Sequence, residues 1–269
     1  MPPVLLHFPA VSPQKLGQHF LADPSWQERI AQAIRIDRGL WVEIGAGHGE
    51  MTLRLAKTAA KVVAIEIDPR LAARLREVTA GHANVEVVQG DVLAVDLEHW
   101  TRGERFSVYG NLPYYITSPI LRRLFAHSAR IGEIHAVIQF EVAARIVARP
   151  GRRDYGYLSV LSQWFSRPEI VFRIPPGAFR PRPKVASALV SLHLPGERAS
   201  KPVADENAFL HFVKECFAQK RKTLRNNLRR RLGKRTAEVL QRAGIPADAR
   251  AEQLAISEFS ALFGLLPGP

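Results

Sequence analysis

Cysteine is almost absent from this sequence of 269 residues, in which Cys216 is the only one. A single cysteine excludes an intramolecular disulfide and any metal site built from several thiolates. Long apolar runs are also absent, since no stretch approaches the roughly 18 uncharged residues of a membrane-spanning helix. Residues 1–13 are rich in proline and lack the pattern of a secretory signal or a transit peptide. We therefore expect a cytoplasmic protein that does not enter a membrane, and we assign it no metal.

Acidic residues are scarce relative to basic ones. Lys and Arg number 38 against 25 Asp and Glu, which gives a formal net charge of +13. Hydrophobic residues make up 46% of the chain, an ordinary globular composition. A positive surplus of this size attracts polyanions, of which nucleic acid is the commonest and an anionic membrane surface the main rival.

The segment from Lys220 to Arg235 holds nine basic residues and no acidic one. Leu224, Leu228 and Leu232 recur there at helical spacing, so a helix can bury its leucines and expose its cations. Such a run can be a solvated helix face, but a solvated face normally mixes charges of both signs. Aromatic residues, which favour membrane binding, are missing from the segment. The residues that we expect to bind RNA are Lys220, Arg221, Lys222, Arg225, Arg229 and Arg230.

Short apolar runs alternate with helical segments through the first part of the chain. The runs are LWVEI (40–44), KVVAIEID (61–68), VEVVQGD (85–91), FSVYGN (106–111) and EIHAVIQF (133–140). This alternation predicts an α/β fold with a mostly parallel sheet. Residues 152–159 (RRDYGYLS) are typical of a loop, and the chain after about residue 205 reads as helical. The predicted division is an arm at 1–13, an α/β domain at 14–198 and a helical, RNA-binding domain at 199–269.

Three predicted strands each end in residues suited to ligand binding. Gly45-Ala46-Gly47-His48-Gly49 follows the first, and glycines allow the backbone to approach a ligand closely. Glu66 ends the second, 21 positions after Gly45, where an acid binds the ribose hydroxyls of a nucleotide-like ligand. Asp91 ends the third. A plain tight turn and two helix-capping acids would be the structural alternative.

The fourth strand ends in Gly110-Asn111-Leu112-Pro113-Tyr114. Asn111 offers an amide oxygen, Pro113 a carbonyl without a competing N–H, and Tyr114 a flat aromatic face. Together these groups suit a planar ring with an exocyclic amine. A turn with a buried tyrosine is the alternative.

The chain resembles the ribosomal RNA adenine N6,N6-dimethyltransferases over nearly its whole length, from about Gln14 to Leu266. The motifs that carry the resemblance are QKLGQHFL (14–21), VEIGAGHGEMT (42–52), VAIEID (63–68), QGD (89–91), GNLPYYITSPI (110–120), QFEVAARIVA (139–148), YGYLS (155–159) and PPGAFRPRPKVASALV (175–190). The resemblance implies a Rossmann-like methyltransferase domain that uses S-adenosylmethionine. It also implies a substrate of two adjacent adenosines in the 3′-terminal hairpin loop of 16S rRNA, presented by an immature 30S subunit to a monomeric enzyme.

Site roles follow from the same resemblance. His19 and Leu21 would line the cofactor pocket, Gly45 would lie under the methionine part, Glu66 would bind the ribose and Asp91 the adenine amine. Asn111 would stand between cofactor and substrate.

For the target adenine, Tyr114 and Phe179 would hold the flipped base. Asn111 and the carbonyl of Pro113 would accept hydrogen bonds from its N6 amine, so that positioning rather than a general base supplies the rate. Two alternatives stay open: a large-subunit adenine methyltransferase of the antibiotic-resistance type, and a chiefly non-catalytic factor that binds pre-ribosomal RNA.

Overall fold

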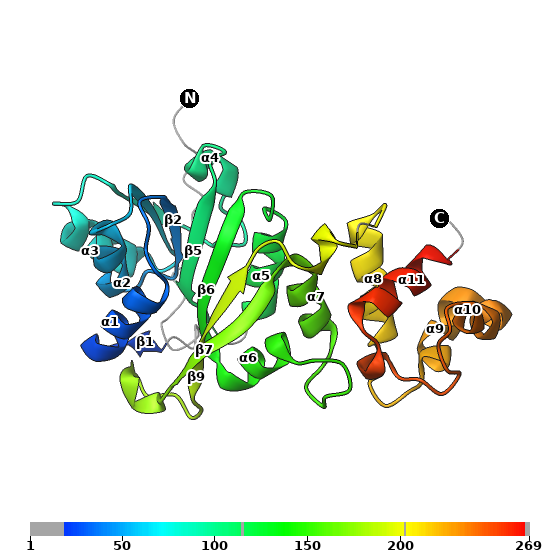
Figure 1. Cartoon of the computed structure of the whole chain (residues 1–269). Coiled ribbons are helices and arrows are strands. Elements are labelled where there is room, and N and C mark those ends of the chain that lie inside the picture. Colours follow the sequence, from blue (N-terminus) through cyan, green and yellow to red (C-terminus); the bar gives the residue numbers. More distant parts are fainter. Residues whose placement is uncertain (1–18, 114–115, 202, 267–269) are drawn as a thin grey trace. The chain divides into compact units, whose positions relative to one another are not determined.

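The computed structural model describes residues 19–113, 116–201 and 203–266 (Figure 1). The chain forms two compact units, one from residues 1–140 with Val171–Ser191 and one from Glu141–Ile170 with residues 192–269. The predicted arm at 1–13 lies outside the described residues. The second unit includes residues 141–170 and 192–198, which the predicted division assigns to the α/β domain. The domain boundary at 198/199 stays a prediction.

One seven-stranded sheet organises the fold, and the α/β class predicted from the sequence is confirmed. In spatial order its strands are β4 (Val85–Gln89), β3 (Lys61–Glu66), β2 (Leu40–Ile44), β5 (Phe106–Asn111), β6 (Ile131–Gln139), β9 (Ser187–His193) and β7 (Arg167–Ile174). The pairs β4–β3, β3–β2, β2–β5 and β5–β6 are parallel. The chain runs from β2 outward to β4 and then crosses to β5 on the other side of β2. Strand order therefore reverses between β2 and β5, and open α/β sheets bind ligands beyond the carboxyl ends of the strands at such a point.

The central strands are apolar because the sheet is covered. Every residue of β2 is buried, and five of the six residues of β3 are buried as well. Parallel strands with helices packed against them read as continuous hydrophobic runs for this reason. The helices of the first unit are α1 (Pro24–Ala33), α2 (Glu50–Ala56), α3 (Pro69–Thr79), α4 (Leu97–Thr101) and α5 (Thr117–Phe125).

Asp-Pro pairs begin two of these helices. The carboxylate of Asp23 accepts from the backbone N–H of Ser25, and that of Asp68 accepts from the N–H of Arg70. Each proline stands at the first helical position, where no N–H is needed. Both Asp-Pro pairs therefore cap the helix that follows them, and this pattern is a strong helix-start signal in a sequence.

A two-stranded ribbon adds long-range order beside the main sheet. β1 (Phe20–Leu21) pairs antiparallel with β8 (Phe179–Arg180), so Leu21 lies opposite Phe179. The ribbon brings the beginning of the described chain to the proline-rich segment around residue 180.

Helices dominate the second unit. They are α6 (Phe140–Val147), whose first residue belongs to the first unit, α7 (Tyr157–Phe165), α8 (Glu206–Cys216), α9 (Leu224–Leu232), α10 (Thr236–Arg242) and α11 (Ile256–Gly264). Aromatic rings fill the interior, with Trp164 and Phe209 at 4.5 Å between ring centroids and Phe212 and Phe263 at 5.7 Å.

The loop predicted for residues 152–159 is wrong at its end, because α7 begins at Tyr157. The hydroxyl of Ser159 accepts from the N–H of Gly156 and donates to the carbonyl of Arg145, which stabilises the start of the helix. None of the helices in the described part of the chain is long and apolar enough to cross a membrane.

Candidate functional site

The loop after β2 has a backbone that only glycine adopts easily. Gly45, Gly47 and Gly49 have φ angles of +71°, +58° and +92°. A side chain at Gly49 would place its Cβ 2.8 Å from Leu75 of α3, so the helix packs directly on this backbone. The loop therefore runs tightly from strand to helix, and its role in binding a ligand stays a prediction.

Glu66, at the end of β3, holds this loop in place. One of its carboxylate oxygens accepts the N–H of Gly47 at 2.8 Å and the other accepts the N–H of Asp68 at 2.9 Å. The side chain is buried, and desolvation raises the pKa of its carboxyl against the opposing effect of these two N–H groups. The backbone N–H of Ile67 also lowers the pKa of this carboxyl, so three main-chain N–H groups stabilise its charged form.

Asp91 follows β4 at the same edge of the sheet and is half-buried. One of its oxygens accepts the N–H of Leu93 at 2.9 Å, while the N–H of the preceding Gly90 donates to the backbone carbonyl of Glu66 at 2.9 Å. The structure thus places Gly45, Glu66 and Asp91 at the ends of three adjacent strands, as predicted.

Asn111, at the end of β5, is oriented by a distant segment. Its side-chain N–H donates to the backbone carbonyl of His19 at 2.8 Å. A Cβ on Gly45 would lie 3.6 Å from the backbone carbonyl oxygen of Asn111, so the glycine loop and Asn111 meet at the point where strand order reverses. His19 enters this arrangement through its main chain, and its ring Nδ1 lies 2.7 Å from the carbonyl of Pro181.

The turn after Asn111 contains a partner that sequence reasoning missed. The carbonyl of Pro113 accepts from the N–H of Ile116 and from the hydroxyl of Thr117, both at 3.2 Å. These bonds fix the entry into α5, and an incoming amine would have to share this carbonyl with them. Tyr114 lies outside the described residues.

Phe179 and Leu21 lie in the hydrophobic core. Phe179 is 0% exposed and Leu21 is 7% exposed, and both pack in one cluster with Trp41 and Leu189. The ring of Phe179 would need a local rearrangement to contact an adenine face. Its role as a base-stacking residue, and that of Leu21 as a cofactor contact, remain predictions.

Glu43 and Tyr109 form a buried polar pair that sequence analysis did not single out. They face each other in the register of β2 and β5, and both are fully covered. Glu43 accepts a hydrogen bond from the hydroxyl of Thr52 at 2.5 Å, whereas the hydroxyl of Tyr109 has no hydrogen-bond partner among the described residues. Burial raises the pKa of Glu43 to about 8 and also raises the pKa of Tyr109. The acid of the VEIG motif could have been flagged by its position inside an otherwise apolar strand.

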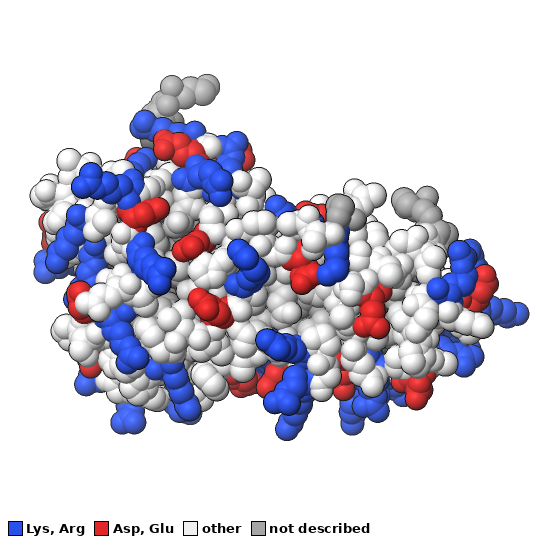
Figure 2. All heavy atoms as spheres, viewed as in Figure 1, with Lys and Arg blue, Asp and Glu red and all other residues white. Residues whose placement is uncertain are grey.

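The basic segment folds as predicted. Leu224, Leu228 and Leu232 are buried along α9, and Thr223 caps the helix by accepting the N–H of Asn226. All six cations predicted to bind RNA are exposed: Lys220, Arg221, Lys222, Arg225, Arg229 and Arg230. Figure 2 shows Lys and Arg side chains spread over the face in view, with fewer Asp and Glu among them.

Two cations of the segment contact other groups of the protein. Arg231 pairs with Glu215 at 3.0 Å, and the ammonium of Lys220 donates to the backbone carbonyl of Arg153. Among the described residues, no group of three or more His, Cys, Asp or Glu side chains is arranged to hold a metal.

Comparison with known proteins places the chain among ribosomal RNA methyltransferases. A family model described as "Ribosomal RNA adenine dimethylase" matches residues 12–266. Proteins named "Ribosomal RNA small subunit methyltransferase A" are similar: one from Acidobacterium capsulatum is 43% identical over 94% of this chain and 90% of its own length. A second, from Koribacter versatilis, is 42% identical over 94% of this chain and 93% of its own length.

Two solved structures share the fold over most of the chain. A dimethyladenosine transferase from Plasmodium falciparum is 26% identical with a TM-score of 0.79, covering 91% of this chain and 96% of its own. The 23S rRNA methyltransferase ErmE is 30% identical with a TM-score of 0.68, covering 92% and 99%.

Proposed function

The chain belongs to the ribosomal RNA adenine dimethylase family, and on this premise we propose that it dimethylates N6 of two adjacent adenosines in the 3′-terminal hairpin loop of 16S rRNA. The observation that carries the proposal is the placement of Asn111 beside the glycine loop with its amide held by the carbonyl of His19. The physiological substrate would be the RNA of an immature 30S subunit, bound by a monomer.

The residues at the sheet edge fit S-adenosylmethionine as the methyl donor. Gly45 is exposed and has no side chain to obstruct a ligand, and Asp91 is half-buried. Glu66 ends the neighbouring strand, and its carboxylate is held against the glycine loop by the N–H of Gly47. Glu66 would accept from the ribose hydroxyls and Asp91 from the adenine amine of the donor. When bound, this donor supplies an electrophilic methyl carbon on a sulfonium sulfur.

The target amine needs help from the protein because its lone pair is delocalised into the adenine ring. The Oδ1 atom of Asn111 would accept one N6–H, since the amide nitrogen of the same side chain is committed to His19. The Pro113 carbonyl would accept the second in competition with Thr117. Both bonds favour a pyramidal nitrogen whose lone pair points at the methyl carbon. Positioning then supplies most of the rate, and the proton leaves to water after the C–N bond forms.

The RNA must deliver an unstacked adenine to this edge. Flipping a base costs a few kcal/mol, less in a loop than in a helix. The exposed cations of α9 and of the turn before it would bind phosphates of the same RNA and offset part of that cost.

Relatives named for the small subunit favour this substrate over the large-subunit alternative. They are 40–43% identical to this chain, whereas the 23S rRNA methyltransferase ErmE is 30% identical. Mapping the methylated nucleotides separates the two substrates directly.

A methyl-transfer assay tests the proposal. Labelled S-adenosylmethionine is incubated with immature small subunits and the wild-type protein, and label is expected in the 3′-terminal hairpin at two adjacent adenosines. Asn111→Ala is the matched variant and should incorporate little label. Equal incorporation by this variant would refute the role of Asn111, and label in large-subunit RNA alone would refute the substrate. A variant without transfer that still supports subunit assembly would favour the non-catalytic role.

A further inference from the structure

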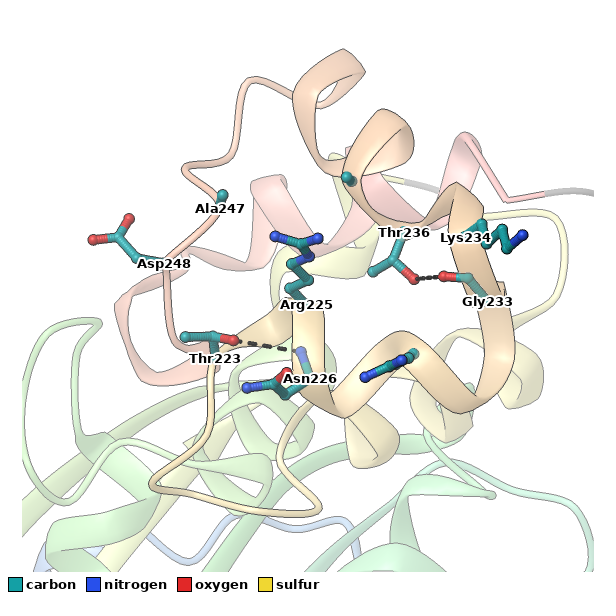
Figure 3. A pocket seen from close by; sticks show the side chains of 10 residues that line it. Thr223, Arg225, Asn226, Gly233, Lys234, Thr236, Ala247 and Asp248 are labelled. Carbon is teal, nitrogen blue, oxygen red and sulfur yellow. Dashed lines mark hydrogen bonds between the residues drawn. The ribbon is translucent and has the colours of Figure 1, made fainter.

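The second unit contains a cavity of about 660 Å³ that the proposed chemistry does not use (Figure 3). Its walls come from α9, the turn between α9 and α10, the start of α10 and the loop after α10. The lining residues are Thr223, Arg225, Asn226, Arg229, Gly233, Lys234, Thr236, Ala237, Ala247 and Asp248. The volume falls within the roughly 300–1,000 Å³ of small-ligand sites.

The lining is strongly positive. The charged residues of the lining are Arg225, Arg229, Lys234 and one carboxylate, Asp248, which leaves a formal charge of +2. Within the part of the chain that the structure describes, none of these three cations has an ion-pair partner, in contrast to Arg231, which pairs with Glu215. Cations that line one cavity and have no ion-pair partner in the protein attract an anionic ligand.

Arg225 occupies the centre of this arrangement. In Figure 3 its guanidinium projects from α9 into the space between the loop that carries Ala247 and the helix that carries Thr236. A guanidinium offers two kinds of contact: its edge forms paired hydrogen bonds with a phosphate, and its plane stacks on a base.

Among the other polar residues of the lining, Asn226 is suited to form hydrogen bonds with a base. The hydroxyls of Thr223 and Thr236 are engaged with the main chain of Asn226 and Gly233, shown as dashed lines in Figure 3. The side chain of Asn226, by contrast, forms no hydrogen bond among the described residues. An amide presents one acceptor and two donor hydrogens, the pattern that complements the edge of an unpaired base.

We propose that this cavity receives one unpaired nucleotide of the ribosomal RNA, with its phosphate on Arg229 and Lys234 and its base against Arg225 and Asn226. The inference rests on the proposed function, since it deepens how the same RNA is recognised. It differs from general attraction to phosphates, because a concave site is filled by an extruded nucleotide and not by a continuous duplex. The exposed cations outside the cavity, such as Arg221 and Arg230, would bind duplex and single-stranded RNA alike.

A pair of RNA hairpins tests the site: one with a single bulged nucleotide in its stem, the other fully paired. Binding of each is measured by fluorescence anisotropy at the same salt concentration. Ala237→Trp fills the cavity without changing charge, at a position that is already exposed. It should weaken binding of the bulged hairpin about tenfold, as expected for the loss of one stacked base. Binding of the paired hairpin should change less than about twofold.

Two further variants make the test specific. Ala261→Trp places the same bulk on an exposed position of α11 outside the cavity and should leave both affinities unchanged. Arg225→Lys keeps the charge and removes the planar group, so it should weaken the bulged hairpin selectively. Equal loss on both hairpins in Ala237→Trp, no loss on either, or wild-type binding of the bulged hairpin by Arg225→Lys would each overturn the proposal.

These binding measurements do not depend on methyl transfer. A wild-type protein that discriminates the two hairpins but transfers no methyl group would contradict the proposed function and leave the cavity assignment standing. One that methylates small subunits but binds both hairpins equally, with or without Ala237→Trp, would contradict only the cavity assignment.

Discussion

The side-chain amide of Asn111 donates a 2.8 Å hydrogen bond to the backbone carbonyl of His19, a residue 92 positions earlier in the chain. Because the amide nitrogen is occupied, the orientation of the side chain is fixed and its oxygen is the atom left to accept. A residue at the end of the central strand β5 is thereby positioned by a segment that precedes the whole sheet. The antiparallel ribbon of Phe20–Leu21 with Phe179–Arg180 keeps that segment in place.

Replacing Asn111 should therefore reduce methyl transfer sharply. Asn111→Ala removes the acceptor for the target amine and should lower kcat by about 10²-fold or more. Asn111→Asp cannot donate to the His19 carbonyl and should also be impaired, although it keeps an oxygen at nearly the same place. Single-turnover transfer to small subunits measures both.

His19→Ala serves as the comparison, because it retains the backbone carbonyl that Asn111 uses. We expect a clearly smaller loss than in Asn111→Ala. A loss as large as that of the asparagine variant would show that the imidazole of His19, not its carbonyl, organises the site.

The sequence predicted which strand ends carry the site but not how their side chains are held. Glycine spacing and acids at strand ends are local signals, and they located Gly45, Glu66 and Asp91 correctly on adjacent strands. The bonds from Asn111 to His19 and from Thr117 to Pro113 depend on tertiary placement and on a turn. Glu43 stands out as an acid within an apolar run, but its position beside Tyr109 depends on how β2 and β5 pair, which the sequence does not show.

Glu43 makes the stability of the fold depend on pH. Its pKa rises from 4.5 to about 8 because the carboxyl is buried. In the unfolded chain the Glu43 carboxyl ionises above about pH 4.5, whereas in the folded chain it keeps its proton up to about pH 8. Its contribution to stability is therefore fully present below pH 4.5 and is lost as pH rises through 8. Between those two values the free energy of unfolding falls by about 1.4 kcal/mol per pH unit.

Glu43→Gln should remove this dependence. The amide oxygen of glutamine can still accept the hydroxyl hydrogen of Thr52, and it carries no charge at any pH. The difference in unfolding free energy between variant and wild type, measured by urea denaturation from pH 5 to 8, should move steadily in favour of the variant. A difference that stays constant over this range would mean that Glu43 is not protonated in the folded protein.

Phe179 allows packing and base stacking to be separated. The ring is fully buried, so Phe179→Ala should destabilise the protein by about 3–5 kcal/mol. Phe179→Leu keeps most of the apolar volume but offers no aromatic face. If the ring stacks on the flipped adenine, kcat/KM for methyl transfer should fall about tenfold, since such stacking contributes about 1–3 kcal/mol.

The control for this experiment is Phe106→Leu, a buried phenylalanine at the opposite end of β5 from Asn111. It should cost similar stability and leave kcat/KM near the wild-type value. Wild-type transfer by Phe179→Leu would remove Phe179 from the site and leave it as a core residue.

The elements of the first unit could be predicted from the sequence more completely than those of the second unit. Apolar runs of β-branched residues, and the Asp-Pro pairs at Asp23 and Asp68, are strong local signals for buried strands and helix starts. The start of α7 was missed because Gly156 lies between Tyr155 and Tyr157, and glycine has a low helix propensity. Its stability comes from packing, as with Trp164 against Phe209, which no local pattern contains.

RNA binding should depend steeply on salt. If about six of the exposed cations of the basic segment neutralise phosphates, log K should fall with log salt at a slope of roughly −4 to −5. The triple variant Lys220→Ala, Arg221→Ala and Lys222→Ala should reduce the magnitude of that slope by about 2 to 3, because each lost phosphate contact removes about 0.7–0.9.

A second triple variant, Arg38→Ala, Lys57→Ala and Arg76→Ala, removes the same charge from exposed positions of the first unit and should leave the slope unchanged. Filter binding of small-subunit RNA between low and moderate salt measures both. Equal slopes for the two variants would mean that net charge alone attracts the RNA, and the basic segment would then have no special place in binding it.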